Sequence, residues 1–239
     1  MDVVDGLRRI APHLPRGLQT RCESTFDHFD RANRLLEIDR EMASFRAITG
    51  EEEAATALMR AVQIRNYDGS EKLKASRHHH KAAIVATITA IRNTVQPILA
   101  EFQLVFDFAK GRIDLKIPLT TFGVAGGEDL CIQPVEPLGL LQTREGVHEL
   151  DVYGEALDEF ARKTEPGTII KLINAQANAR NRLLYASDEA LPQSRATAST
   201  IEERKQRALA MLVLTVMVFQ SRHHLDLVRQ ALATVLKVI

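Results

Sequence analysis

Residues 208–219, with the sequence ALAMLVLTVMVF, are the longest apolar run of the chain and the feature that most constrains its fold. At about 12 residues the run is shorter than the roughly 20 that cross a bilayer, so we expect no membrane association. Because a helix of this sequence is apolar around its circumference, it should be buried in the core or at a homodimer interface. The Ser199 to Glu202 spacing is that of a capping box and predicts the helix start, and compactness requires a break near Gln220 and Ser221.

Other segments also show helical periodicity. Apolar residues recur every three or four positions over residues 20–47, including Ile38, which predicts a long amphipathic helix. The Thr49 and Glu52 spacing predicts that a second helix starts there, or that one helix bends. After a turn at residues 67–70, a third helix is expected over residues 76–110, kinked or split by Pro97. The remaining expected helices cover residues 151–163 and 168–187, with a stop at Pro166 and Gly167 between them.

Residues 112–141 have a different pattern. Apolar and polar residues alternate over residues 113–117 and again over 130–132, with turn-forming residues 123–129 between them. This predicts a β-hairpin inserted between helices. The expected fold class is therefore mainly α, a multi-helix bundle with a small inserted β-hairpin, within a single domain of residues 1–239.

Composition limits the functional classes. Lys plus Arg and Asp plus Glu are both 31, so the chain lacks the overall basic excess of a dedicated nucleic-acid binder, and only local basic patches remain. Cys22 and Cys131 form no CxxC pair, which favours neither a thiolate metal site nor a disulfide framework. The first residues lack the pattern of a secretory signal, so we expect a cytoplasmic protein.

The segment KLKASRHHHKAA, residues 72–83, places His78, His79 and His80 in a row. Neighbouring residues of a helix point about 100 degrees apart, so these three rings cannot converge on one metal ion. At most two of them can be joined by His223 or His224, and we expect no metal or other cofactor. The alternative is a polar helix start. Because positive charge is unfavourable at a helix N-terminus, an acidic partner or an anion is then expected beside it.

The segment AITGEEEAATALMRA, residues 47–61, contains three consecutive glutamates. If the apolar stripe of the preceding helix continues, Glu52 faces the bundle interior. A buried carboxylate needs a cation, which Lys81 and the histidines would supply if the two helices pack as a hairpin. The alternative is that Glu51, Glu52 and Glu53 simply form the acidic first turn of a helix.

The segment NAQANARNRLLYASDE, residues 174–189, has alanines that allow close backbone approach beside Arg180. Arginine is a planar donor suited to phosphate or carboxylate. Asn181 can orient it or contact a base, and Tyr185 lies about one and a half turns further along a helix. The alternative is an ordinary helix in which Arg180 pairs with an acid and Tyr185 packs at the rim.

Taken in order, these segments resemble the AbiV-type abortive-infection proteins and the wider HEPN class of helical, RNA-directed domains. The resemblance covers residues 20–189. The residues that carry it are Ala47, Glu51 to Ala55, His80 with Lys81, and the run from Arg180 through Tyr185.

HEPN membership implies a helical bundle, often dimeric, in which Arg and His of an R-x4-6-H motif cleave RNA without a metal. This sequence has Tyr185 where that motif has histidine. A neutral phenol does not act as a general base near pH 7 as imidazole does, so the departure puts RNase activity in doubt. Arg21 with His28 also has a matching spacing, of a kind expected by chance in a chain rich in arginine.

We therefore expect a phage-defence or stress-response protein that engages RNA or the translation machinery, as a metal-independent RNase or without cleavage. A non-catalytic interaction module, with Glu52, Lys81 and Arg180 as a structural ion network, is the second hypothesis. A metal-dependent hydrolase using the histidines is the third. The expected catalytic residues are Arg180 on the phosphate, Asn181 and Tyr185 positioning it, and His78, His79, His80 or His28 as the acid–base group; the expected binding residues are Glu52, Glu53, Lys81 and Arg182.

Overall fold

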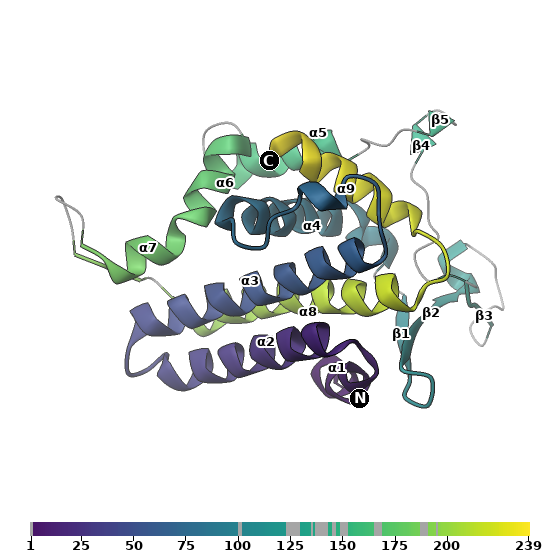
Figure 1. Ribbon diagram of the computed structural model, residues 1–239, viewed down its shortest axis with the longest axis horizontal. Coiled ribbons are helices and arrows are strands. Elements are labelled where there is room, and N and C mark those ends of the chain that lie inside the picture. Colours follow the sequence, from purple (N-terminus) through teal and green to yellow (C-terminus); the bar gives the residue numbers. More distant parts are fainter. Residues whose placement is uncertain are drawn as a thin grey trace.

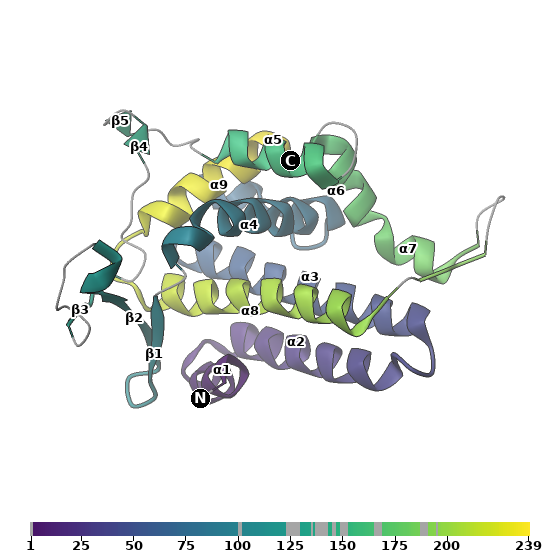
Figure 2. The same ribbon diagram turned by 180° about the vertical axis from the view of Figure 1, so that it is seen from behind.

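The computed structural model describes residues 2–99, 102–122, 130–134, 136, 143–144, 147–148, 153–164, 169–186, 191–194 and 196–239. The fold is mainly α-helical, with a small antiparallel sheet, as predicted. Two long helices lie side by side at its centre. Two helices cover one side of them, and on the other side one helix lies against them with three more packed on it (Figures 1 and 2). The central helices are α3 (Arg40–Ile64) and α8 (Ala198–Gln220), the first side has α1 (Val3–Ile10) and α2 (Arg16–Leu35), and the second has α4 (His78–Leu99), α5 (Gly154–Thr164), α6 (Ile169–Ala177) and α9 (Asp226–Val238).

Helix α8 contains the apolar run that the sequence placed in the core. Met211, Leu212 and Val218 on this helix are fully buried. The predicted break is confirmed, because α8 ends at Gln220 and Ser221 has an extended backbone. The predicted cap was wrong: Thr197 and Thr200 form the capping box, since each side chain accepts a hydrogen bond from the other's backbone N–H. The homodimer remains a prediction.

The long helix predicted over residues 20–47 is interrupted. Helix α2 ends at Leu35, and α3 starts at Arg40 behind Asp39, whose carboxylate accepts a hydrogen bond from the Met42 backbone N–H at 2.9 Å. Ile38 lies in this break with 82% of its surface exposed, so its assignment to the apolar stripe was wrong.

No helix starts at Thr49. The hydroxyl of Thr49 donates to the Phe45 carbonyl within α3, a helix of 25 residues that has no break there. The glutamates after it are therefore in the middle of a helix, and the acidic-first-turn interpretation was wrong.

Helix α4 ends at Leu99, before the predicted end at residue 110, because the chain turns into strand β1 (Gln103–Asp107). This strand pairs antiparallel with β2 (Arg112–Pro118), through a turn at Gly111 with a positive φ of 62°. Strand β2 also pairs with β3 (Cys131–Ile132), which confirms the predicted strands. The predicted turn at residues 123–129 lies outside the described residues. A separate two-stranded ribbon is formed by β4 (Thr143–Arg144) and β5 (Val147–His148), and short 3-10 turns occur at Ala11–His13, Ser70–Lys72 and Leu119–Phe122.

The helix predicted over residues 168–187 is divided in two. Helix α6 ends at Ala177, Asn178 forms a turn, and α7 (Ala179–Leu184) follows at the end of the bundle opposite the sheet (Figure 1). The predicted stop at Pro166 and Gly167 falls outside the described residues. Within the described part of the chain, none of the helices combines the length and hydropathy needed for a membrane span.

Candidate functional site

Glu52 on α3 is a buried carboxylate, 8% exposed, to which two other helices contribute cations. Its Oε1 atom lies 2.9 Å from Nδ1 of His78. Its Oε2 atom accepts hydrogen bonds from Nζ of Lys81 at 3.1 Å and from Nη1 of Arg180 at 3.2 Å. One carboxylate oxygen of Glu52 therefore binds an imidazole, and the other binds an ammonium and a guanidinium.

The start of α4 explains two of these contacts. His78 and Lys81 are three residues apart on its first turn, so their side chains lie on the same face of the helix. A turn at Gly69, whose φ is 79°, lets the chain reverse between α3 and α4. Glu52 supplies the negative charge that basic residues need at a helix N-terminus, and the predicted contact of Glu52 with the His/Lys segment is confirmed.

Arg180 comes from α7. Its guanidinium lies over the ring of Phe45, 4.7 Å from the ring centre, while Nη1 reaches Glu52. Phe45 and Glu52 are seven residues apart on α3, about two turns, and so share one face. The Nε atom of Arg180 is buried and has no hydrogen-bond partner among the described residues. Nε therefore remains an unpaired donor inside the protein, while the Arg180 side chain as a whole is 26% exposed.

Solvent exposure increases from the carboxylate at the centre of the site to its outer side chains. The side chains of Glu52 and Lys81 are 11% and 12% exposed, whereas those of Arg180 and His78 are 26% and 44% exposed. Because a carboxylate only accepts hydrogen bonds, Nδ1 of His78 must carry the hydrogen in this contact, and in the neutral ring Nε2 is then the basic atom. One carboxylate faces two permanent cations, so the cluster has excess positive charge.

The other two histidines of the row do not join this cluster. His80 is buried, and its Nδ1 atom accepts a hydrogen bond from the Lys74 backbone N–H at 3.2 Å. His79 is exposed and lines a pocket next to α6 together with Arg77 and Ile173. The sequence did not distinguish among the three, and only His78 reaches Glu52.

The residues that follow Arg180 have other surroundings. Arg182 donates to the Ala175 carbonyl at 2.9 Å and so caps α6. Tyr185 ends α7 and is 68% exposed, and Asn181 is also exposed. Within the described residues neither side chain has a hydrogen bond or ion pair to Arg180 or Glu52, so the structure does not link these candidates to the cluster.

The three consecutive glutamates face three different directions, as a spacing of about 100 degrees requires. Glu51 is 4% exposed and pairs with Arg204 and Arg207 of α8, the latter at 2.6 Å. Glu53 pairs with Arg21 of α2. The pairing of Glu51 with α8 was missed from the sequence; the Arg204 and Arg207 spacing of three residues was the signal for it.

His28 lies on α2 in a separate environment. Its Nδ1 atom is buried and has no hydrogen-bond partner in the described part of the chain. Burial first, and then the charge of Arg46, lower the pKa of His28 below its ordinary value, while Glu53 opposes this shift. His28 and Arg21 therefore both lie near Glu53, away from the contacts of Arg180.

The histidines near residue 224 do not extend the row at residues 78–80. His224 stacks on Tyr67, with ring centres 4.2 Å apart, and hydrogen-bonds the Arg65 carbonyl. Among the described residues there is no group of three or more His, Cys, Asp or Glu side chains placed to hold a metal ion.

His80 makes the stability of the fold depend on pH. Burial, and then Arg77, lower its pKa below the ordinary 6.5. The folded state therefore binds this proton less readily than the unfolded state, and stability falls as the pH drops below 6.5, by at most about 1.4 kcal/mol per pH unit. In His80→Asn, whose amide oxygen can accept from Lys74 without titrating, urea unfolding from pH 7 to pH 5 should show a smaller loss. Equal losses in the two proteins would contradict this assignment.

Comparisons of this chain with family models, with curated proteins and with solved structures gave no match.

Proposed function

We propose that this protein is a metal-independent ribonuclease of a phage-defence or stress-response system, with its reaction centre at Glu52, His78, Lys81 and Arg180. The observation that carries the proposal is that the two oxygens of Glu52 have different partners: Oε1 binds an imidazole, and Oε2 binds two cations. A carboxylate that fixes one nitrogen of a histidine leaves the other oriented for proton transfer. The resemblance to AbiV and HEPN proteins favours RNA as the substrate.

The chemistry needs no metal ion. Nε2 of His78 accepts the proton of a ribose 2′-hydroxyl, and the 2′-oxygen attacks the adjacent phosphorus. The bond from phosphorus to the 5′-oxygen breaks, and the proton held by His78 passes to that oxygen. The products are a 2′,3′-cyclic phosphate and a 5′-hydroxyl end. The partly exposed guanidinium of Arg180, with Lys81 beside it on Glu52, stabilises the charge on the phosphate oxygens.

The surroundings of the site suit a polyanion. Residues 72–81 contain Lys72, Lys74, Arg77 and Lys81 and no acidic residue, beside the exposed His78 and His79. Such a local patch supports phosphate contacts although the chain as a whole has no excess of basic residues.

The test is incubation of the purified protein with labelled RNA in EDTA. We expect cleavage by the wild-type protein and a loss of roughly two to three orders of magnitude in Arg180→Ala, because removing one donor to the transition state has an effect of that size. Circular dichroism checks that the variant is folded. RNA that stays intact with the wild-type protein would overturn the proposal and favour the structural ion network of an interaction module.

A further inference from the structure

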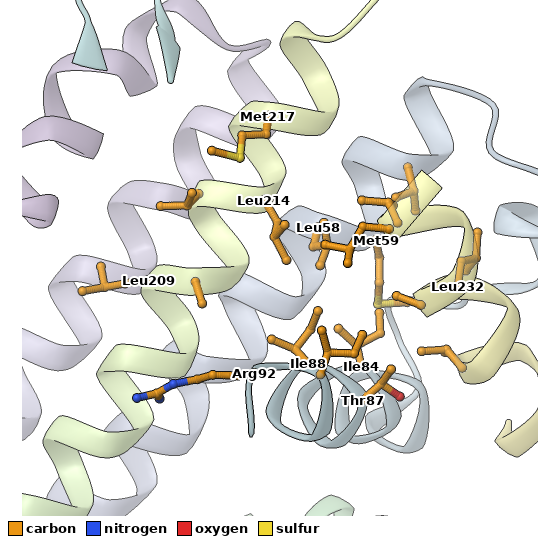
Figure 3. A pocket seen from close by; sticks show the side chains of 18 of the residues that line it. Leu58, Met59, Ile84, Thr87, Ile88, Arg92, Leu209, Leu214, Met217 and Leu232 are labelled. Carbon is orange, nitrogen blue, oxygen red and sulfur yellow. The ribbon is translucent and has the colours of Figure 1, made fainter. Parts of the chain in front are cut away.

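A second feature of the fold is a pocket of about 400 Å³ between α3, α4, α8 and α9. Figure 3 shows α4 on one side of it, carrying Ile84 and Ile88, and α8 with Leu209 and Leu214 on another. The volume is typical of small-molecule sites and exceeds that of an engineered cavity of roughly 150 Å³ that binds benzene. The pocket is thus large enough to hold a ligand.

The interior of the pocket is apolar. Apart from Thr87, Arg92 and Gln206, every lining residue that the structure describes is hydrophobic. Thr87 is fully buried, and its hydroxyl has no hydrogen-bond partner among the described residues. An ordered water needs about two to four polar partners, which this wall does not supply, and an empty apolar cavity lowers stability. An alkyl chain fits these requirements.

The rim of the pocket is polar. Arg92 and Gln206 are exposed, and in Figure 3 the Arg92 guanidinium points away from the labelled apolar side chains. Gln206 donates its amide to Glu202, whereas Arg92 has no ion pair or hydrogen bond to any residue that the structure describes. A guanidinium binds a carboxylate through two parallel hydrogen bonds.

We propose that this pocket binds one free long-chain carboxylic acid, with its alkyl chain inside and its carboxylate against Arg92. Arg92 is the one charged side chain among the described residues of the lining, and it matches one negative charge, so a carboxylate suits the rim better than a phosphate dianion. The proposal does not depend on RNA cleavage, because the pocket uses Leu58, Met59 and Val62 of α3 and none of the residues around Glu52.

The test begins with binding of 11-(dansylamino)undecanoic acid, followed by fluorescence, and with displacement of this probe by palmitate. Native mass spectrometry should show one palmitate per chain. Hexadecan-1-ol and hexadecyltrimethylammonium, which have the same chain without the negative charge, should displace the probe roughly tenfold less well, as expected for loss of a charge-assisted hydrogen bond. No binding of the probe, or equal displacement by all three compounds, would overturn the proposal.

Variants locate the site. Arg92→Glu should weaken palmitate binding roughly tenfold or more and leave hexadecan-1-ol unaffected. Arg34→Glu is the matched control, because Arg34 is exposed on α2, on the other side of the bundle (Figure 1). Ala210→Phe should fill the pocket and abolish binding of both compounds. If Ala210→Phe does not fold, the comparison of the two arginine variants decides the matter.

Two other outcomes would identify a different occupant and overturn the proposal. Self-association that Ala210→Phe disrupts, without palmitate binding by the wild type, would show that a second copy of the chain covers the pocket. Flotation with phosphatidylglycerol vesicles that requires Arg92, again without binding of free palmitate, would show a membrane surface.

Discussion

His78→Ala is expected to slow RNA cleavage by about 10²–10⁴-fold, the usual effect of removing a general acid–base group. The variant should fold, because the lost side chain is 44% exposed and Glu52 keeps its hydrogen bonds to Lys81 and Arg180. Cleavage of a labelled RNA under single-turnover conditions in EDTA measures the effect.

His79→Ala is the matched control for this variant. His79 is the next residue of the same helix turn, is exposed and has no contact with Glu52. Its replacement should leave the cleavage rate nearly unchanged. Equal losses in both variants would mean that the histidines act only through general basic charge, and no loss in His78→Ala would remove it from the reaction.

Glu51→Gln is expected to lower the free energy of unfolding by about 3 kcal/mol, because it leaves two guanidiniums between α3 and α8 without their counter-charge. We take the lower end of the range for breaking a buried pair, since Arg204 and Arg207 are 31% and 20% exposed and water screens part of the loss. Urea unfolding followed by circular dichroism measures the change.

Glu53→Gln is the control for the structural prediction. Glu53 lies two residues after Glu51 on the same helix, and its partner Arg21 is 44% exposed. The substitution should therefore lower the free energy of unfolding by less than about 1 kcal/mol. Similar losses in the two variants would show that the pairing of Glu51 with α8 contributes no more than an exposed ion pair does.

The central helix and the strands could be predicted because their patterns are local. The apolar run of residues 208–219 is hydrophobic on all sides, so only burial suits it, and α8 occupies the centre of the bundle. The alternation over residues 113–117 persists through β2. Phe102, Leu104 and Phe106 alternate in a similar way, but they follow a strong helical pattern, which predicts a continuing helix where the structure has β1.

The helix boundaries were harder to predict because the three-four spacing continues across the break at Ile38. The capping side chain of Asp39 was the local signal for that break. Because the spacing alone does not show the start of α3, the sequence is also compatible with a helix start at Glu51 to Glu53, and it does not assign their three separate partners. The contact of Glu52 with His78 and Lys81 could be predicted from the sequence. A buried carboxylate needs a cation, and a basic segment follows the turn at residues 67–70 that connects α3 to α4.

The residues around Arg180 show a limit of motif-based prediction. The sequence predicts one helix over residues 168–187, in which the side chains of Arg180 and Tyr185 would reach the same pocket. Helix α7 ends at Leu184, and Tyr185 after it has an extended backbone and an exposed side chain. The acid–base group proposed for the reaction therefore comes from another helix, α4, and no spacing within α7 reveals it.

The most direct test of the proposed reaction uses a DNA oligonucleotide that contains one ribonucleotide, incubated with the wild-type protein in EDTA. A reaction that starts from a 2′-hydroxyl should cut once, on the 3′ side of the ribonucleotide, and leave a 2′,3′-cyclic phosphate and a 5′-hydroxyl end. The all-DNA counterpart should stay intact. Cleavage of the all-DNA oligonucleotide would contradict the proposed role of His78 and Glu52. The absence of cleavage of both oligonucleotides and of RNA of mixed sequence would contradict it as well.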